Sequence, residues 1–167
     1  MKRLLLAVVV VAASCASNGP AAPAPGSPDV ACVDDFCIVY PGDWEAAPGV
    51  GYVSFTHPTA PDRAMATISI LNMEGVVVNA GGVWPTTPDE VARAFWQLLE
   101  EAEVADLVRL ERRVGGSVES FGSYQDGRLW HLLIPVDATR AIGVEVRGPN
   151  NSWETHADVF FSNVTGP

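Results

Sequence analysis

Apolar and polar residues alternate along several short stretches of this chain. Between residues 141 and 147 the apolar Ile142, Val144 and Val146 are separated by Gly143 and Glu145. A period of two residues predicts β-strands that bury one face. The same pattern, with runs of β-branched and aromatic residues, predicts further strands at residues 36–40, 52–56, 67–71, 107–114, 118–124 and 128–136.

The later strands are expected to form an antiparallel meander. Asp126 and Gly127 lie between two predicted strands, and an Asp-Gly pair in that setting is a strong hairpin signal. Residues 129–134 are almost all apolar, which predicts a central strand covered on both faces. Helices are therefore expected on the faces of this sheet.

A helix is predicted to begin after Thr87. Thr87 is a suitable N-cap, Pro88 suits the first helical position, and Glu90 completes a capping box. The helix is expected to run to about Glu103. One face would carry the apolar residues that recur at helical spacing, which are Val91, Phe95, Leu98, Leu99 and Ala102.

A second helix is predicted near the C-terminus, over residues 153–164. Apolar residues recur there at helical spacing, and Asn151 or Ser152 can cap the helix. Residues 159–161 are also compatible with a strand.

The first fifteen residues have the pattern of an export signal. Lys2 and Arg3 precede an unbroken apolar run and three small residues, and Cys15 follows. The run is shorter than the roughly 20 apolar residues that span a bilayer. Residues 12–15 resemble the bacterial lipobox, which implies a signal peptide at residues 1–14 and a lipid anchor on the sulfur of Cys15. The alternative is an ordinary secreted protein in which Cys15 is incidental.

The rest of the chain is expected to form a linker and one domain. Residues 15–30 are rich in Ala, Pro, Gly and Ser, which predicts a semi-rigid linker. Residues 31–167 have the length of a single domain, and 48% of the whole chain is hydrophobic, so the domain can bury a core.

Cys32 and Cys37 are predicted to form a disulfide. A lipidated Cys15 would leave these as the only two cysteines, in a compartment that allows disulfides. Asp34 and Asp35 between them suit a tight turn. The spacing is not that of a C-x-x-C redox motif.

The charge of the chain excludes one class of partner. The formal net charge is −10, and removing the leader leaves eight basic and twenty acidic side chains, a net charge of −12. Phosphate-rich nucleic acid needs clustered Lys and Arg, so nucleic-acid binding is not expected.

No catalytic or metal-binding motif is found in the sequence. His57, His131 and His156 are the only histidines, and they have no metal-ligand spacing. No serine lies in a Gly-x-Ser-x-Gly elbow. The sequence therefore indicates no cofactor and no metal, and names no catalytic residue.

The order of elements resembles the PsbP-like family. The resemblance rests on a strand leading into YPGDW at residues 40–44, on the helix opened by TPDE at residues 87–90, and on the meander followed by a C-terminal helix. The chain is also similar to mycobacterial lipoproteins of the LpqN type. The resemblance implies an α+β fold, an antiparallel sheet flanked by helices, and a binding or assembly role without catalysis.

These features predict a lipid-anchored, extracytoplasmic binding or assembly module of the bacterial cell envelope. Its membrane contact would be the anchor on Cys15, and its partner an envelope protein or a lipid-like ligand. A groove between helix and sheet, or exposed aromatic residues such as Trp84 and Trp130, would be the binding site. The alternatives are an envelope hydrolase or transferase, favoured by a polar pocket with His131 or His57 beside a carboxylate, and a small-ligand or lipid carrier.

Overall fold

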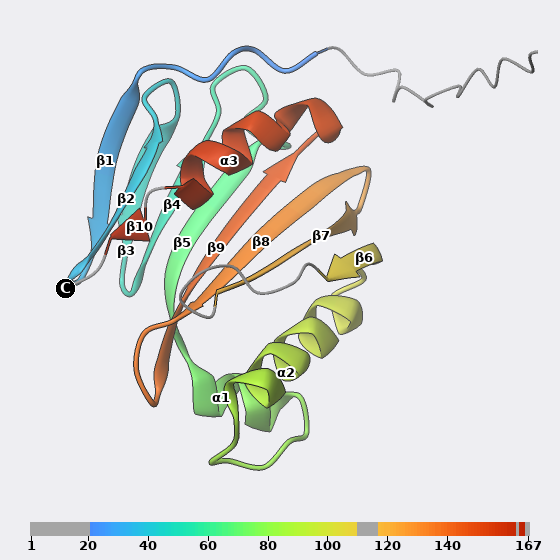
Figure 1. Cartoon of the computed structure of the whole chain (residues 1–167). Helices are drawn as coiled ribbons and strands as arrows, with labels where there is room; N and C mark the ends of the chain where they lie inside the picture. The colour runs from blue at the N-terminus through green and yellow to red at the C-terminus, as the bar shows by residue number, and fades with distance from the viewer. Residues whose placement is uncertain (1–20, 110–116, 163, 166–167) are drawn as a thin grey trace, which may run out of the picture.

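The computed structural model describes residues 21–109, 117–162 and 164–165. The predicted signal peptide and Cys15 lie outside this part of the chain. The described residues form an α+β fold with two antiparallel sheets and helices on both faces of the larger one (Figure 1). The predicted fold class is confirmed.

The larger sheet has seven strands in the order β3-β4-β5-β9-β8-β7-β6. Its later strands form the predicted meander, with β8 between β7 and β9 and five consecutive buried residues in β8. The strands of this sheet are β3 Glu45–Gly49, β4 Tyr52–Thr56, β5 Met65–Asn72, β6 Ala105–Arg109, β7 Val118–Tyr124, β8 Gly127–Pro135 and β9 Arg140–Gly148.

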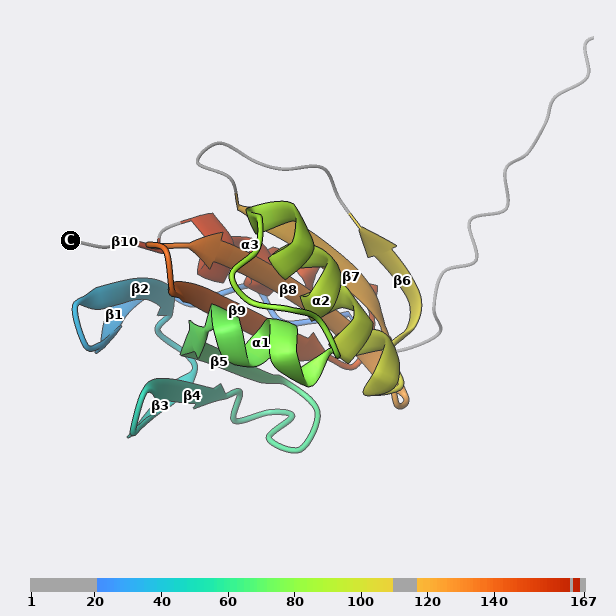
Figure 2. The ribbon, with the colours of Figure 1, turned by 90° about the horizontal axis from the view of Figure 1, so that it is seen from below.

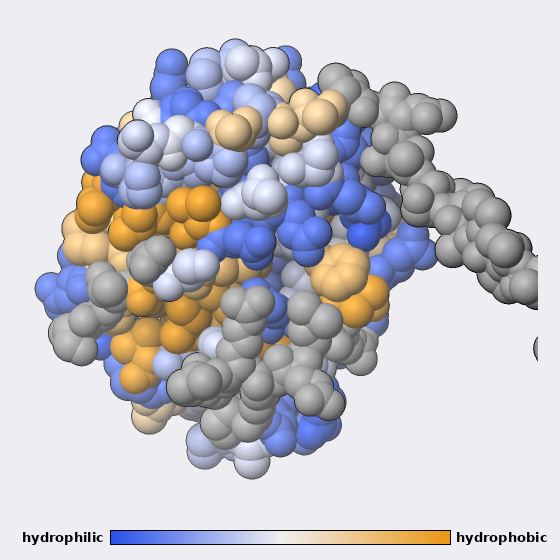
Figure 3. Space-filling model, turned by 45° about the horizontal axis from the view of Figure 1, so that its top comes forward, coloured by the Kyte–Doolittle hydropathy of each residue, from blue (hydrophilic) through white to orange (hydrophobic). Residues whose placement is uncertain are grey.

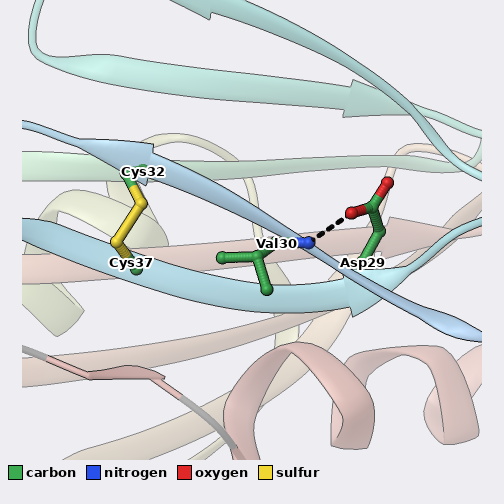
Figure 4. The surroundings of a disulfide bond; sticks show 4 residues. All are labelled: Asp29, Val30, Cys32 and Cys37. Atoms are coloured by element: carbon green, nitrogen blue, oxygen red, sulfur yellow. Dashed lines mark hydrogen bonds between the residues drawn. A yellow bond between two sulfur atoms is a disulfide. The ribbon is translucent and has the colours of Figure 1, made fainter.

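The smaller sheet has three strands, β1 Pro28–Val33, β2 Phe36–Pro41 and β10 Val164–Thr165, in the order β1-β2-β10. A disulfide joins Cys32 and Cys37, which face each other across the β1–β2 hairpin (Figure 4). The turn between them contains Asp34 with a positive φ of 49°, a conformation that Asp adopts more readily than most residues.

Two helices cover one end of the larger sheet on the same face (Figure 2). They are α1 Met73–Asn79 and α2 Pro88–Glu101, and Thr87 caps α2 by accepting a hydrogen bond from the Glu90 amide. A buried cluster joins Met73 and Val77 of α1 to Val91 of α2 and Leu133 of β8. The predicted cap at Thr87 is confirmed, whereas Glu90, expected to complete a capping box, pairs with Arg93, and α2 ends at Glu101 rather than near Glu103.

The opposite face of the larger sheet carries the main core. It is covered by the β1–β2 hairpin and by α3 Glu154–Ser162, which follows a short 3-10 helix at Asn151–Trp153. Phe160 of α3 is fully buried, and its ring lies 5.1 Å from Phe55 and 5.2 Å from Trp44 between centroids. Burial of such aromatic groups stabilises the packing on this face.

Strands β1, β3 and β10 and helix α1 were not predicted from the sequence. Strand β3 contains Ala46, Ala47 and Pro48, which have little preference for strands, and all five of its residues are exposed at the sheet edge. Helix α1 contains three consecutive β-branched valines, and it forms because Asn72 caps it and Met73 and Val77 are buried beneath it.

The predicted C-terminal helix is present as α3, so residues 159–161 are helical and not a strand, but its ends differ from the prediction. Asn150, and not Asn151 or Ser152, accepts a capping hydrogen bond from the Ser152 amide, and it caps the short 3-10 helix that precedes α3. Helix α3 ends at Ser162, and Val164 pairs with Ile38 of β2 as part of β10. Val164 gains strand hydrogen bonds there, which a helical pattern in the sequence cannot reveal.

The start of β6 also differs from its prediction. The strand begins at Ala105 and is described as far as Arg109. Residues 110–114 of the predicted strand lie outside the described part of the chain.

Candidate functional site

The turn after β2 places two side chains at the centre of a polar and aromatic cluster. Pro41 and Gly42 end β2, and the Trp44 amide donates to the Pro41 carbonyl to close the turn. Asp43 then points toward the β4–β5 loop, and Trp44 is buried against α3. The YPGDW segment thereby connects the small sheet, the large sheet and the C-terminal helix.

His156 links Trp44 to the N-terminal part of the chain. The Trp44 indole N–H donates to Nδ1 of His156 across 3.0 Å, so Nε2 of His156 carries the hydrogen that is donated to the Pro23 carbonyl at 2.9 Å. The imidazole is thus neutral with both nitrogens satisfied. Desolvation by burial lowers the pKa of His156 and favours this neutral form.

His57 forms a second chain of hydrogen bonds at the start of the β4–β5 loop. The Thr59 amide and hydroxyl both donate to Nδ1 of His57, the hydroxyl at 2.8 Å. Nε2 of His57 therefore donates to Oδ2 of Asp43, at 3.1 Å. Burial alone would raise the pKa of Asp43, but hydrogen bonds from the Gly26 amide and His57 outweigh it and lower the pKa. Asp43 is therefore ionised and orients the imidazole ring.

Residues 21–27, which we call the N-terminal strap, are attached to this cluster. The Ala22 amide donates to Oγ of Ser152 at 2.7 Å, and the Gly26 amide donates to Oδ1 of Asp43 at 2.9 Å. The Pro23 carbonyl accepts from His156, as described above. Residues 15–30 were predicted to be a linker, but their described part is bonded to the domain, and residues 28–30 belong to β1.

A groove of about 660 Å³ opens between the N-terminal strap, the β4–β5 loop and the segment before α3. Most of its wall is apolar or uncharged. The lining residues are Ala21, Pro23, Thr59, Ala60, Pro61, Asp62, Arg63, Pro149, Asn150 and Trp153. The volume is within the roughly 300–1,000 Å³ typical of ligand sites.

The two charged residues of the groove differ in their partners. Arg63 donates to both the carbonyl and the carboxylate of Asp126, each at 3.1 Å. Asp62 is exposed and has no hydrogen bond or ion pair with the described residues. The charge of the groove that is not paired within the described residues is therefore the negative charge of Asp62.

His131 lies apart from this cluster, under α2. Its ring stacks on Phe95 with centroids 4.3 Å apart, and it is fully buried in the sheet. Burial lowers the pKa of His131 to about 3, so the side chain is neutral and acts as a core residue. His131 thus does not belong to the groove, whereas His57 and His156 are hydrogen-bonded to the groove residues Thr59 and Pro23.

The aromatic residues predicted as possible contact sites are largely buried. Trp130 is only 6% exposed and belongs to the main core, and Trp84 packs against the cluster under α1 and α2. The 660 Å³ groove lies beside the N-terminal strap. A pocket between a helix and the sheet, as was expected, is also present, but it is smaller, about 90 Å³, and lies between α3 and strands β7 and β8 with Trp130 in its lining. The one sequence signal near the groove beside the strap is YPGDW, whose Asp43 and Trp44 hold its walls.

A further small pocket, of about 50 Å³, lies beside the β7–β8 turn. The space-filling view shows two groups of apolar residues on the face in view, a larger one on the left and a smaller one on the right, with hydrophilic residues between them (Figure 3). Within the described ranges, no group of three or more His, Cys, Asp or Glu side chains is placed to hold a metal ion. No helix in that part of the chain is long and apolar enough to cross a membrane.

Comparison with known proteins identifies the fold. No protein family model matches the chain, and no curated protein matches it. Among solved structures, the cyanobacterial PsbP (CyanoP) of Synechocystis is 14% identical, with a TM-score of 0.51 over 92% of this chain and 98% of that one. This likeness confirms the PsbP-like fold that the sequence predicted, and it extends to the fold alone.

Two further structures are more distant in shape. LpqN, described as involved in cell envelope biogenesis of Mycobacterium tuberculosis, is 16% identical, with a TM-score of 0.48 over 86% of each chain. A protein from Bacteroides thetaiotaomicron is 15% identical, with a TM-score of 0.49 over 86% of this chain. This chain spans 49% of the Bacteroides protein, about half its length.

Proposed function

We propose that this protein is a non-catalytic binding or assembly module of the bacterial cell envelope, held at the membrane by a lipid on Cys15. The observation that carries the proposal is the attachment of the N-terminal strap beside the groove. Only residues 16–20 separate Cys15 from Ala21, a groove residue. At 3.3–3.6 Å per residue this segment reaches at most about 20 Å. An anchored Cys15 would therefore hold the groove close to the membrane surface.

The walls of the groove support binding rather than chemistry. Three prolines and Trp153 supply fixed apolar surface, and the polar side chains of Thr59 and Asn150 are held in place by hydrogen bonds to His57 and Ser152. Such a mixture of apolar wall and few polar groups is typical of binding sites. The acidic net charge of the chain also favours a protein partner over anionic lipid or nucleic acid.

The anchor is tested by replacing Cys15 with Ser. The wild-type protein is expected to partition into the detergent phase of a Triton X-114 extract, and the C15S protein into the aqueous phase with an altered mass. Detergent partitioning of C15S with unchanged mass would refute the anchor.

The binding role is tested by crosslinking the protein in its own membrane and identifying bound proteins by mass spectrometry. The same envelope protein is expected in repeated purifications of the wild type and at a lower yield from C15S. Turnover of an envelope substrate that is lost on mutation of one polar cluster would contradict a purely binding role.

A second candidate is an envelope hydrolase or transferase, which the Asp43–His57–Thr59 chain favours. A hydroxyl 2.8 Å from an imidazole that a carboxylate orients has the arrangement of a nucleophile and its base. The Thr59 amide donates to the same nitrogen, as in a turn closed by a side chain. The variant T59V distinguishes a catalytic Thr59 from one that only closes the turn. Loss of p-nitrophenyl butyrate hydrolysis with unchanged stability would support the enzyme.

A further inference from the structure

The groove is built from three separate segments that are each held in place. The N-terminal strap forms one wall, residues 59–63 form the second, and Pro149, Asn150 and Trp153 form the floor. Trp153 is only 4% exposed, so its ring supports the floor rather than projecting from it. These segments are far apart in sequence, and the groove exists only when all three are assembled.

The walls are fixed before any ligand arrives. Pro23 is held by His156 and Ala22 by Ser152, while Thr59 is held by His57. Backbone hydrogen bonds within residues 57–64 close the second wall further. A preorganised site loses little entropy on binding, which favours short segments that a flexible surface would bind weakly.

The charge of the groove selects the ligand. Arg63 is neutralised by Asp126, and Asp62 has no partner among the described residues. The remaining lining groups are uncharged. An apolar segment with one positive charge would thus complement the groove in both polarity and charge, and a negative group would be repelled.

We propose that the groove binds an extended apolar segment of a partner protein through one Arg or Lys that pairs with Asp62. This inference deepens the proposed function and rests on it for the identity of the partner as an envelope protein. The groove and its preference for a basic peptide do not depend on which partner binds, so they can be tested on the purified protein.

The test uses three synthetic peptides, Ac-Ala-Pro-Val-Xaa-Val-Pro-Ala-NH2, with Arg, Gln or Glu at Xaa. Each is titrated into the disulfide-bonded protein that carries C15S, and amide shifts are followed by NMR. We expect the Arg peptide to bind about fivefold tighter than the Gln peptide, as for an exposed ion pair, and the Glu peptide to bind most weakly. Shifts should centre on Thr59, Ala60 and Asn150.

Two variants separate charge from shape. D62N should abolish the difference between the Arg and Gln peptides, whereas the surface variant D89N on α2, away from the groove, should preserve it. S152A removes the acceptor of the Ala22 amide and should weaken all three peptides by a similar factor. Equal affinity for the three peptides, no binding, shifts outside the groove, or an unchanged Arg preference in D62N would each overturn the inference.

Failure here and failure of the proposed function are distinguishable. If the peptides do not bind but an envelope protein is crosslinked repeatedly, the partner uses another surface and the groove inference is wrong. If the Arg peptide binds through Asp62 but no envelope protein is crosslinked, the groove is a peptide site and the assembly role is wrong.

Discussion

Trp44 donates its indole N–H to Nδ1 of His156 across 3.0 Å, although 112 residues separate them in the chain. This bond fixes the tautomer of His156 and so directs its other nitrogen to the Pro23 carbonyl. One side chain of the YPGDW turn thereby determines where the N-terminal strap lies. The strap in turn forms one wall of the groove.

Replacing Trp44 with Phe should lower the free energy of unfolding by about 3 kcal/mol. The variant loses a buried hydrogen bond and leaves space beside Phe160. Urea denaturation followed by circular dichroism measures the change. Trp84→Phe, at a partly buried site, is the control and should cost less. Equal costs for the two variants would show that the bond to His156 contributes little.

Replacing Asp43 with Asn should destabilise the protein by about 1 kcal/mol at pH 7, because a charged acceptor is lost from Gly26 and His57. The native pKa of Asp43 is lowered, so its stabilisation is present above the unfolded pKa and disappears as the pH falls through the native pKa. The difference between D43N and wild type should therefore be smaller in acid than at pH 7. Unfolding free energies at pH 7 and pH 3 measure it, with the exposed D126N as the control.

Replacing His131 with Phe should make stability less dependent on pH. The unfolded imidazole gains a proton below about pH 6.5, whereas burial lowers the native pKa to about 3, so acid favours the unfolded wild type. As the pH is lowered through this window, His131 should decrease the free energy of unfolding of the wild type by up to about 1.4 kcal/mol per pH unit. The slope from pH 6.5 to 4.5 should be smaller in H131F. Identical slopes would mean that His131 is accessible to protons in the native state.

Two glycine substitutions should have opposite effects. At Gly148 an added Cβ would lie 2.5 Å from Cβ of Trp153, so G148A should cost about 1–3 kcal/mol and disturb the floor of the groove. In α1 an added Cβ at Gly75 meets nothing closer than 3.9 Å, so G75A should stabilise the protein by about 0.5–1 kcal/mol. Thermal unfolding of both variants measures this, and a stabilising G148A would contradict the close packing there.

Removing the disulfide with the paired substitution C32S and C37S should lower stability by about 2 kcal/mol, because the cross-link closes only a short loop. The β1–β2 hairpin is also held by strand pairing and by the buried Val33 and Phe36, so the fold should persist. Denaturation of the oxidised, reduced and substituted proteins measures the effect. Complete unfolding on reduction would show that the hairpin depends on the cross-link.

The sequence by itself determined most of the elements and their class. The alternation of apolar and polar residues predicted β4, β5 and β9, and the capping signals predicted α2, because strand periodicity and caps depend on residues close together in the chain. The sequence did not predict β3 or α1. An exposed edge strand has no hydrophobic pattern, and a helix of β-branched residues forms only when tertiary packing buries it.

Only the tertiary structure decided the candidate site. Pro23, Asp43, His57 and His156 are separate in the sequence, and each has an ordinary local explanation there. Their hydrogen bonds exist only after the strap, the β2 turn, the β4–β5 loop and α3 have packed together. A proline-rich composition indicates a chain with few internal contacts, but it contains no information about acceptors and donors elsewhere. For this reason the segment that was predicted to be part of a linker is instead bonded to the domain and forms one wall of the groove.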